Sequence, residues 1–565
     1  YNASPYLSAL TTLMALFFAL DLMLMSQYSP SEVRSAMDAG EMKPPVGVQS
    51  VPSLSGSKPL ITIGVMLAGL MAFLDISIVN VALTDIRANF GTPLDQIGWI
   101  STSYMMANVV IIPLTGFLQR RFGFRRYFVG SVLLFVSASI LCAMAWNLQS
   151  LVLFRILQGC GGGAIIPTAN AILLSRYPNE QQGLANGLFG LGAVTGPLLG
   201  PTLGGYLINV SNWHWIFLIN VPIGVTSAIL VWRFLEQPGF SPSRQPMERV
   251  SLALLVCGLG SLQYVLEEGH RNDWLESSTV VLGTIVAVAS LVTFAVRQLE
   301  ISNPIVDLRI FANRNYSAAT LINFLLGIAL FSGTYLSSLF SGAVMRYDAL
   351  TIGMVTLGPG LMQFFLMPVI GQSASRFDKR LLLAIGAALM CTSLWMTAHL
   401  NASVSFDQIV RPSYFRFLST GFLFIPLALT ALSDLTPDAR GNAAGLFNLT
   451  RELGGSCGTA ILSTMLDTRT RLHAARLGEH LTSIDPSTQW QLAGMRAIAG
   501  FRSPDADGAA YYLLNMKVSH VSLAWAFQDC FFALMLAFML CFPLLLLLRF
   551  PTDSALTSQQ VHLSE

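Results

Sequence analysis

The sequence predicts an all-α polytopic membrane protein, with two parallel six-span halves and two further spans inserted between them. Three observations support this fold class. Hydrophobic residues make up 53% of the 565-residue chain and charged residues only 11%, whereas soluble domains carry about 25% charged residues. Apolar stretches of membrane-spanning length recur along the chain. Motifs from the first half return in the second half.

Fourteen apolar segments approach or exceed the length that a bilayer-spanning helix needs, about 20 residues. They fall near 61–83, 97–118, 127–146, 150–174, 184–209, 214–235, 250–266, 277–296, 316–341, 350–372, 381–400, 412–433, 441–465 and 526–548.

The distribution of Arg and Lys between the short loops predicts the orientation. Loops after even-numbered spans carry fifteen such residues, and loops after odd-numbered spans carry four, leaving aside the long segment 466–525. Cytoplasmic loops are enriched in Lys and Arg. We therefore expect the loops after even-numbered spans to be cytoplasmic and segment 466–525 to be an outside loop.

The first 59 residues fit this scheme less well. Tyr6 to Met25 is another apolar stretch, interrupted by Asp21, and the chain begins with Tyr1 rather than Met. Two interpretations stay open: a fifteenth span, or a leader or upstream in-frame extension with Met42 as an alternative start.

An internal repeat relates the two halves. Pro113-x-x-Gly116, Arg121-Phe122 and Arg125 return as Pro368-x-x-Gly371, Arg376-Phe377 and Arg380, offset by 255. Gly183-x-Ala185-x-Gly187-Leu188-Phe189 returns as Gly441-x-Ala443-x-Gly445-Leu446-Phe447, offset by 258, and Phe154-Arg155-x-Leu157 returns as Phe415-Arg416-x-Leu418. The repeat is shifted by eight spans, an even number, so both halves insert in the same orientation.

The repeat sets the expected domain organisation: an N-terminal extension 1–59, a six-span half 60–237, two inserted spans with linker 238–300, a second six-span half 301–549 and a cytoplasmic tail 550–565. Parallel six-span repeats place a substrate site between the halves, near the midplane of the membrane. An alternating-access transporter gains directly from such a duplication.

Asp75 is the only charged residue in its apolar segment, 61–83. An ionisable group inside a span costs at least ~2.5 kcal/mol and usually marks a functional site. Arg155 lies at a similar depth near the outer start of the fourth span, which allows the two side chains to pair across the cavity. Asp75 is predicted to bind the transported proton; the alternative is an ion pair that only orders the helices.

Arg451 and Glu452 lie in the middle of the thirteenth span. Adjacent helical residues point about 100° apart, so each is expected to face another partner or a cavity rather than its neighbour. Glu452 is a candidate for a second proton or cation site, with a pair to another span as the alternative.

Four uncharged polar residues lie within spans and are candidates to line a substrate cavity: Asn80, Asn108, Gln158 and Gln363. Hydrogen bonds between helices explain such residues equally well.

Other functional classes find little support. The seven cysteines lie mostly in apolar segments without a CxxC spacing, so neither a metal site nor a disulfide is predicted. The net charge of +2 does not point to nucleic acid, and HExxH and Walker A motifs are absent from the sequence, which argues against an enzyme.

Several motifs together resemble the major facilitator superfamily, and more closely its fourteen-span drug:proton antiporters of the EmrB/QacA type. The first span carries Leu74-Asp75-Ile76-Ser77-Ile78-Val79-Asn80; the following loop has Gly116-x-Leu118-x-x-Arg121-x-Gly123-x-Arg125-Arg126; the fourth span has Arg155-x-x-Gln158-Gly159. The fifth span has Gly196-x-x-x-Gly200-Pro201-x-x-Gly204-Gly205, similar to the exporters' motif, and Trp213 to Gly224 resembles the EmrB branch.

The resemblance implies roles for two motifs. The glycines of the fifth span are expected to allow close helix approach, and Pro201 a kink, so that this span forms a hinge or a seal between the halves. In the loop motif, Arg120 replaces the family's usual acidic residue, which puts the gating ion pair of that acid in doubt here.

The resemblance also implies the function: proton-coupled efflux of hydrophobic or amphiphilic drugs across the bacterial inner membrane, driven by the proton gradient without a cofactor. In EmrB-type relatives, an outside loop such as 466–525 is compatible with a periplasmic adaptor that leads to an outer-membrane channel. The alternatives are a carrier for a natural metabolite, such as a fatty acid, siderophore or amino acid, and a membrane sensor that moves no protons.

Overall fold

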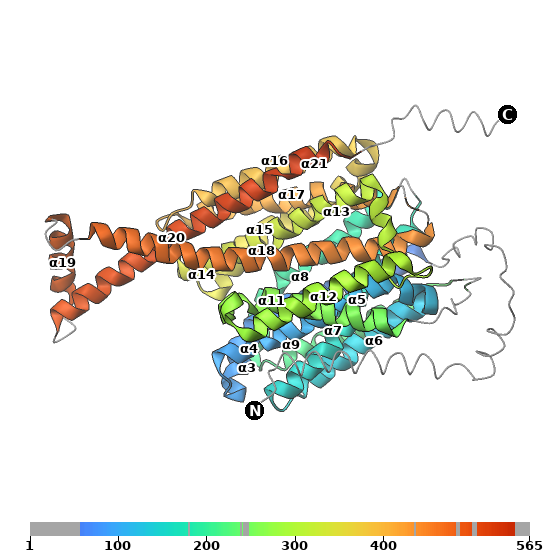
Figure 1. The fold of residues 1–565 in the computed structure, drawn as a ribbon, viewed down its shortest axis with the longest axis horizontal. Helices are drawn as coiled ribbons and strands as arrows, with labels where there is room; N and C mark the ends of the chain where they lie inside the picture. Colours follow the sequence, from blue (N-terminus) through green and yellow to red (C-terminus); the bar gives the residue numbers. More distant parts are fainter. Residues whose placement is uncertain are drawn as a thin grey trace.

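The fold is known from a computed structural model, which describes residues 57–178, 181–237, 240, 248–433, 435, 437–481, 486–499 and 505–548. The apolar stretch from Tyr6 to Met25 and the predicted tail 550–565 lie outside the described residues. The described part is a bundle of long helices (Figure 1). Helices satisfy their own backbone hydrogen bonds, as a chain in lipid requires.

The predicted N-terminal half contains α3 (Lys58–Phe90), α4 (Leu94–Ile97), α5 (Trp99–Phe122), α6 (Phe124–Ala143), α7 (Leu148–Arg176), α8 (Gln182–Val210), α9 (Trp215–Leu218) and α10 (Asn220–Phe234). The inserted segment forms α11 (Arg249–Glu268) and α12 (Ser278–Glu300). The predicted C-terminal half contains α13 (Arg314–Gly327), α14 (Gly333–Ala343), α15 (Ala349–Arg376), α16 (Lys379–Ala398), α17 (Phe406–Ser433), α18 (Pro437–His480), α19 (Pro486–Ala499), α20 (Ala506–Met539) and α21 (Cys541–Leu545).

Twelve helical segments among the described residues are long and apolar enough to cross a membrane. The two remaining predicted spans, 184–209 and 441–465, are also helical, within α8 and the first part of α18. A count of fourteen spans is therefore consistent with the structure. The chain is a multi-pass membrane protein.

The exposed face of α12 illustrates the lipid-facing side of the bundle. Its large exposed side chains are apolar and recur every three or four residues: Leu282, Ile285, Val288, Val292 and Val296 are each at least half exposed. Such a stripe lies on one side of a helix. It is the pattern expected of a surface that faces acyl chains rather than water.

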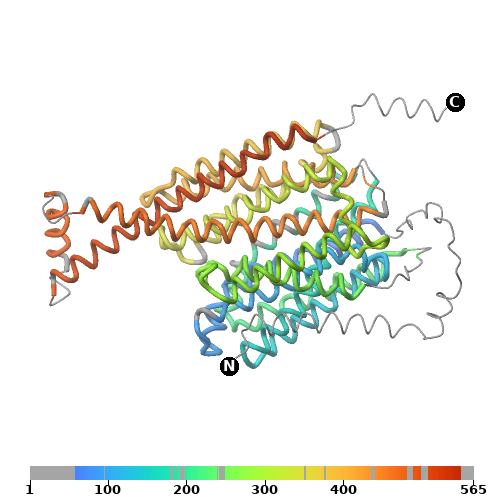
Figure 2. Tube along the Cα trace, in the orientation of Figure 1, coloured from blue at the N-terminus to red at the C-terminus, as the bar shows by residue number. Residues whose placement is uncertain are grey.

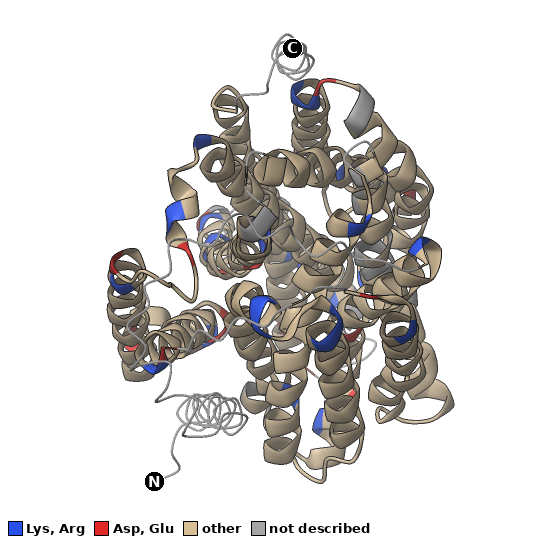
Figure 3. Ribbon diagram, turned by 90° about the vertical axis from the view of Figure 1, so that its right-hand side faces the viewer, with Lys and Arg blue, Asp and Glu red and all other residues tan. Residues whose placement is uncertain are grey.

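The two halves pack against each other through glycines near the predicted cytoplasmic ends of their helices. A Cβ atom at Gly183 of α8 would lie 2.0 Å from the backbone oxygen of Gly371 of α15. A Cβ atom at Gly116 of α5 would lie 2.9 Å from the backbone of Asn442 of α18. Only glycine permits backbones to approach this closely. We call these two contacts the inner seal. Figure 3 looks onto the end of the bundle opposite α19, where several Lys and Arg segments are seen.

The inserted helix α11 contacts both halves. Thr102 of α5 donates a hydrogen bond to Glu268 (3.1 Å), and Gln263 donates one to Ser456 of α18 (2.9 Å). Beyond the end of α11, the Trp274 indole donates to Thr464 of α18 (2.8 Å). The two inserted spans are thus integrated into the bundle, beside the junction of the halves.

The segment 466–525, predicted as an outside connection between spans, is mainly helical in its described residues. α18 continues for 44 residues to His480, α19 follows, and α20 begins at Ala506. At 1.5 Å per residue, α18 is about 66 Å long, about twice the hydrocarbon thickness of a bilayer. Figures 1 and 2 show the extended parts of α18 and α20 projecting from one end of the bundle, with α19 at the tip. We call this projection the arm (466–525).

Candidate functional site

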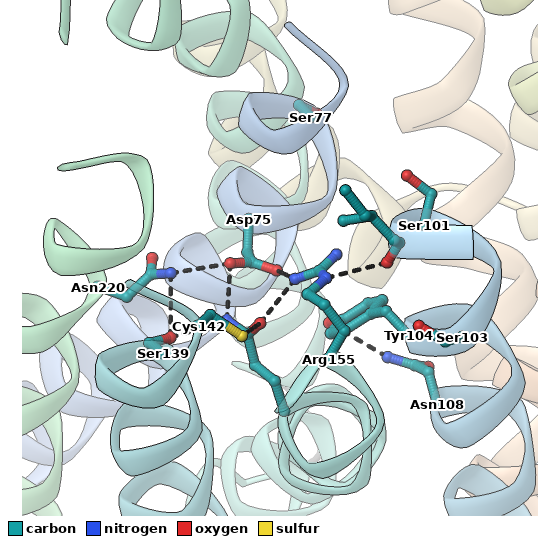
Figure 4. A network of polar contacts seen from close by, with 12 residues as sticks. Asp75, Ser77, Ser101, Ser103, Tyr104, Asn108, Ser139, Cys142, Arg155 and Asn220 are labelled. Carbon is teal, nitrogen blue, oxygen red and sulfur yellow. Dashed lines mark hydrogen bonds and ion pairs between the residues drawn. The ribbon is translucent and has the colours of Figure 1, made fainter. Parts of the chain in front are cut away.

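Asp75 and Arg155 form a fully buried ion pair between α3 and α7. The Arg155 Nη1 atom lies 2.6 Å from Asp75 Oδ2, and the two side chains are 1% and 0% exposed. α7 begins with a capping box, in which Asn147 accepts a hydrogen bond from the Ser150 backbone while the Ser150 hydroxyl accepts one from the Asn147 backbone. This fixed start positions Arg155 just over two turns into the helix. The pair that the sequence allows is present (Figure 4).

Two amides complete the surroundings of Asp75. Gln158 of α7 and Asn220 at the start of α10 each donate to Asp75 Oδ1, both at 2.8 Å. Both amides also face the hydroxyl of Ser139 in α6, at 2.7 Å and 3.4 Å. The carboxylate thus joins four helices of one half.

Arg155 is held from its other side by α5. Its Nε atom donates to the Ile100 carbonyl (3.1 Å), and its guanidinium carbon lies 4.3 Å from the centre of the Tyr104 ring. A buried cation over an aromatic face is stabilised by the ring's quadrupole. Arg155 therefore has a second support besides Asp75.

The geometry around Asp75 suits an ionised carboxylate, because N–H donors face both of its oxygens. Burying such a pair is costly, and the pair holds only while the contacts remain intact. Proton binding to Asp75 therefore requires Arg155 to move away. The pairing also removes one argument for a proton role, namely that intramembrane carboxylates without a partner often belong to relays, and it strengthens the alternative of an ordering ion pair.

Glu452 and Arg451 of α18 lie beside a small cavity between the halves. The cavity is lined by α3, α5 and α7 of one half and α18 of the other: Ile76, Met105, Asn108, Ile112, Gly162, Gly163, Ile166, Pro167, Asn448, Arg451 and Glu452. Glu452 thus faces a cavity, as expected for one of the two interpretations of the sequence. The location between the halves is the one that parallel repeats predict.

The expectation that Arg451 and Glu452 do not pair with each other is wrong. Arg451 Nη2 lies 3.8 Å from Glu452 Oε1, because both side chains are long enough to bend toward each other across the angle between their Cα–Cβ bonds. Arg451 also donates to Asn448 (3.2 Å), and its guanidinium lies 5.0 Å from the Phe424 ring centre. The separation of 3.8 Å makes this a looser pair than that of Asp75 and Arg155.

The four predicted polar residues have different surroundings. Asn108 lines the cavity, whereas Gln158 belongs to the Asp75 network. Gln363 is 2% exposed in α15, and its Nε2 atom is buried without a hydrogen-bond partner. Asn80 lies on the exposed outer part of α3 and accepts a hydrogen bond from Ser101 of α5 (3.2 Å), which fits the alternative of a hydrogen bond between helices.

The loop motif after α5 connects elements of the cytoplasmic side. Gly123 has a φ of +79°, a backbone conformation that favours glycine, and it separates α5 from α6. The Arg125 guanidinium stacks over Trp232 of α10 at 4.3 Å, and Arg126 is exposed. Gly116 belongs to the inner seal, and Arg121 is half-buried at the end of α5.

The glycines of the fifth-span motif pack against α3 of the same half, while α8 itself also lies along α15 of the other half. Cβ atoms at Gly196 and Gly200 would lie 2.4 Å from Phe73 and Ser77 of α3, and one at Gly204 would lie 2.9 Å from Ile78. Gly205 faces open space, and Pro201 lies within α8. The contact of α8 with the other half is made by its earlier glycines, beginning with Gly183.

Arg416 of α17 is the repeat partner of Arg155 and is 2% exposed. Its guanidinium donates to the Gly333 carbonyl and to the hydroxyls of Ser337 (2.9 Å) and Ser413 (3.2 Å). Gly333 directly follows a π-helical turn, Ile328–Ser332, between α13 and α14. Such turns disturb the regular backbone hydrogen bonding of a helix and often occur at functional sites.

Sequence reasoning missed Ser139, Asn220 and Tyr104. Each is a single polar side chain in an apolar segment, a pattern too frequent to single out a site. Asn220 carried a signal, because it lies within the segment from Trp213 to Gly224 that resembles the EmrB branch. The carboxylates Glu267 and Glu268 were missed because the predicted span ended at residue 266, whereas α11 ends at Glu268.

Comparison with known proteins agrees with the fold and the motifs. Residues 65–459 match the model of the Major Facilitator Superfamily. The chain is 34% identical to Multidrug export protein EmrB of Haemophilus influenzae over 439 residues, which cover 78% of this chain and 86% of that protein. It is 32% identical to EmrB of Escherichia coli K12 over 498 residues (88% and 96%) and 32% identical to Fatty acid resistance protein FarB of Neisseria gonorrhoeae over 495 residues (87% and 96%).

Solved structures share the fold at low sequence identity. The human organic anion transporter MFSD10 superimposes with a TM-score of 0.56 at 13% identity, covering 86% of this chain and 98% of that one. The proton:xylose symporter XylE gives a TM-score of 0.55 at 14% identity, covering 84% and 94%. The chain therefore belongs to the Major Facilitator Superfamily, as a member of the EmrB type.

Proposed function

We propose that this protein exports hydrophobic or amphiphilic toxic compounds across the bacterial inner membrane in exchange for protons. The observation that carries the proposal is the 32–34% identity to multidrug export proteins over most of the chain, and the buried charges of Asp75 and Arg155 add to it. A carboxylate and a guanidinium buried together are expensive to maintain. A role in moving charge accounts for that expense.

Asp75 is the proposed proton carrier, and Arg155 sets its protonation state. Contact with Arg155 favours the ionised carboxylate, whereas an apolar surrounding without that cation favours the acid. When the protein opens outward, a rearrangement within the N-terminal half takes Arg155 off Asp75, which takes up a proton from outside while the transported compound leaves on the same side. When the protein opens inward, Arg155 returns to Asp75, and the proton is released toward the cytoplasm as the next molecule of the compound binds.

Glu452 is the proposed second ionisable group. It lines the cavity together with residues of the other half, and its pairing with Arg451 is loose at 3.8 Å. A cationic compound in the cavity would compete with Arg451 for the carboxylate. Glu452 therefore selects for cations or takes a second proton.

The proton gradient supplies enough energy for this exchange without a cofactor. One charge that crosses a membrane potential of ~150 mV provides about 3.5 kcal/mol. At about 1.4 kcal/mol per factor of ten, one proton sustains a concentration ratio of a few hundredfold. One proton per molecule of an uncharged compound is therefore sufficient for useful export, whereas exchange for a monovalent cation moves no net charge and draws on the pH difference alone.

A fatty acid is the second candidate substrate. FarB, 32% identical to this chain over 495 residues, carries the name of a fatty acid resistance protein. A long-chain acid is amphiphilic, so it falls within the same chemical class as many hydrophobic drugs.

The arm is the proposed docking site for a periplasmic adaptor, which would connect the pump to an outer-membrane channel. Its large aromatic side chains are exposed, with Trp490 82%, Tyr512 64% and Tyr511 54% accessible. Exposed aromatics of this kind are enriched at protein interfaces. The arm also extends well beyond the length that a bilayer requires.

The test uses inside-out vesicles that are energised so that their interior is acidic. Addition of ethidium, a hydrophobic cation, or oleate, a fatty acid, is expected to release protons from vesicles that contain the protein and not from matched vesicles without it. An uncoupler is expected to abolish accumulation of the compound. A well-folded protein that binds either compound but moves no protons would overturn antiport in favour of a sensor or an uncoupled carrier.

A further inference from the structure

Tyr104 lies between the two candidate charge sites. It belongs to α5 and is 1% exposed. Its ring centre lies 4.3 Å from the Arg155 guanidinium carbon, and the Phe217 ring centre lies 5.8 Å from the same atom. Figure 4 shows Tyr104 beside Arg155. Tyr104 thus contacts the cation that decides the state of Asp75, without contacting Asp75 itself.

The hydroxyl of Tyr104 connects this site to the cavity between the halves. The Asn108 amide, one turn further along α5, donates to the Tyr104 hydroxyl at 3.3 Å. Asn108 also lines the cavity that Glu452 and Arg451 line from the other half. A continuous set of contacts therefore runs from Asp75 through Arg155, Tyr104 and Asn108 to the cavity.

Glycines of α7 provide the space for this connection. A Cβ atom at Gly162 would lie 2.5 Å from the Tyr104 hydroxyl, and one at Gly163 would lie 2.5 Å from the Asn108 carbonyl. Both glycines line the cavity as well. Because these two residues carry no side chain, the Tyr104 phenol and the Asn108 amide can shift along α7 without a steric clash.

We propose that Tyr104 is a positioning residue that links two events. Through it, protonation of Asp75 weakens the binding of a molecule in the cavity, and binding of that molecule disfavours protonation of Asp75. This proposal rests on the proposed antiport function. A molecule in the cavity holds Asn108 against the Tyr104 hydroxyl, so the ring stays under Arg155 and Arg155 stays on Asp75. A proton on Asp75 releases Arg155, the phenol follows, and Asn108 turns into the cavity and weakens binding there.

The pH dependence of binding tests this connection. Binding in the cavity expels a proton, so the Kd of the purified protein for ethidium should fall as pH rises. Oleate takes the place of ethidium if ethidium is not transported. One linked proton gives at most about tenfold per pH unit. Tyr104→Phe keeps a ring under Arg155 but loses the hydroxyl, so its Kd should vary by less than about twofold per pH unit in the range where the wild type varies.

Asn108→Ala removes the other partner of the same hydrogen bond. It should flatten the pH dependence to the same degree as Tyr104→Phe, and the double variant should show no further change, because both act through one contact. Tyr316→Phe is the matched control. Tyr316 lies in the C-terminal half and is also fully buried, and its hydroxyl donates to the Ala443 carbonyl (2.9 Å) of the same half. This variant should therefore keep the wild-type pH dependence.

The outcomes separate this inference from the proposed function. If the Kd of Tyr104→Phe changed with pH as strongly as that of the wild type, the role of Tyr104 would be overturned while antiport would stand. An equal loss of affinity at every pH would also overturn it, since that is the result of a purely structural role. A wild-type protein whose Kd does not change with pH would overturn the proposed antiport itself.

Discussion

Arg155 and Arg416 occupy corresponding positions in the two halves, yet Arg155 contacts the carboxylate of Asp75 whereas Arg416 contacts the backbone carbonyl of Gly333. Among the residues that the structure describes, the side chains that accept hydrogen bonds from Arg416 are the hydroxyls of Ser337 and Ser413. The Arg416 Nε atom is buried without a partner. The buried arginine is therefore common to both halves, whereas the paired carboxylate is found in the N-terminal half.

This asymmetry predicts opposite sensitivities to loss of the two cations. Arg155→Met leaves the buried Asp75 carboxylate without a counter-charge and should lower the free energy of unfolding by about 3–5 kcal/mol. Arg416→Met removes a buried cation that has no carboxylate partner, which offsets the lost hydrogen bonds, so the net change should be less than about 2 kcal/mol. Unfolding of both variants in the same detergent measures the difference.

A second substitution checks the cause. In Arg155→Met, the added change Asp75→Asn removes the uncompensated charge and should restore part of the lost stability. Equal destabilisation by Arg155→Met and Arg416→Met would contradict the assigned difference between the halves.

The inner seal predicts that one methyl group shifts the conformational equilibrium. Gly183→Ala places a Cβ atom about where the Gly371 carbonyl now lies, at 2.0 Å, so α8 and α15 must separate at their cytoplasmic ends. The variant should favour a form open to the cytoplasm. A cysteine at Met367, which is 2% exposed beside the seal, should then react with a thiol reagent from the cytoplasmic side about threefold faster or more.

The control for this experiment lies in the same helix. A Cβ atom at Gly205 would meet nothing within 4 Å, so Gly205→Ala should leave the labelling rate unchanged. All measurements use a background in which the seven natural cysteines are replaced. A labelling rate in Gly183→Ala equal to that of the background would show that this contact does not close the inner side.

The arm predicts a separation of partner binding from transport. The combined change Trp490→Ala and Tyr512→Ala removes two of the most exposed aromatics of the arm, far from Asp75. Affinity for a periplasmic adaptor should fall by about tenfold or more, since buried interface aromatics contribute about 2 kcal/mol or more each. Proton release in vesicles should stay at the wild-type level. Undiminished adaptor binding would move the docking site elsewhere on the outer surface.

The sequence identified Asp75, Arg155 and Gln158 because polar groups stand out in apolar segments and because two of them belong to one motif. It did not identify Asn220 and Ser139, whose chemistry also fits ordinary contacts between helices. The sequence could not decide whether Asn80 contacts a substrate or a neighbouring helix, because either role suits a carboxamide within a span; the structure pairs it with Ser101 of α5.

The partners of small residues were also beyond the reach of the sequence. The four-residue spacing of Gly196, Gly200 and Gly204 defines one face of a helix, but it does not say which neighbour that face meets. The structure places α3 there, within the same half. The repeat, in contrast, predicted the arrangement of spans well, because matched motifs at nearly constant offsets constrain topology without any knowledge of side-chain contacts.

Proton release by the purified protein on binding ethidium or oleate, with wild type and Asp75→Asn compared in weakly buffered detergent solution, tests the central claim most directly. The account predicts that the wild type releases up to about one proton per bound molecule, because binding keeps Arg155 on an ionised Asp75. Asp75→Asn should bind the same compound and release no protons. Equal release from both proteins would contradict the account and assign the coupled proton to another group, of which Glu452 is the first to examine.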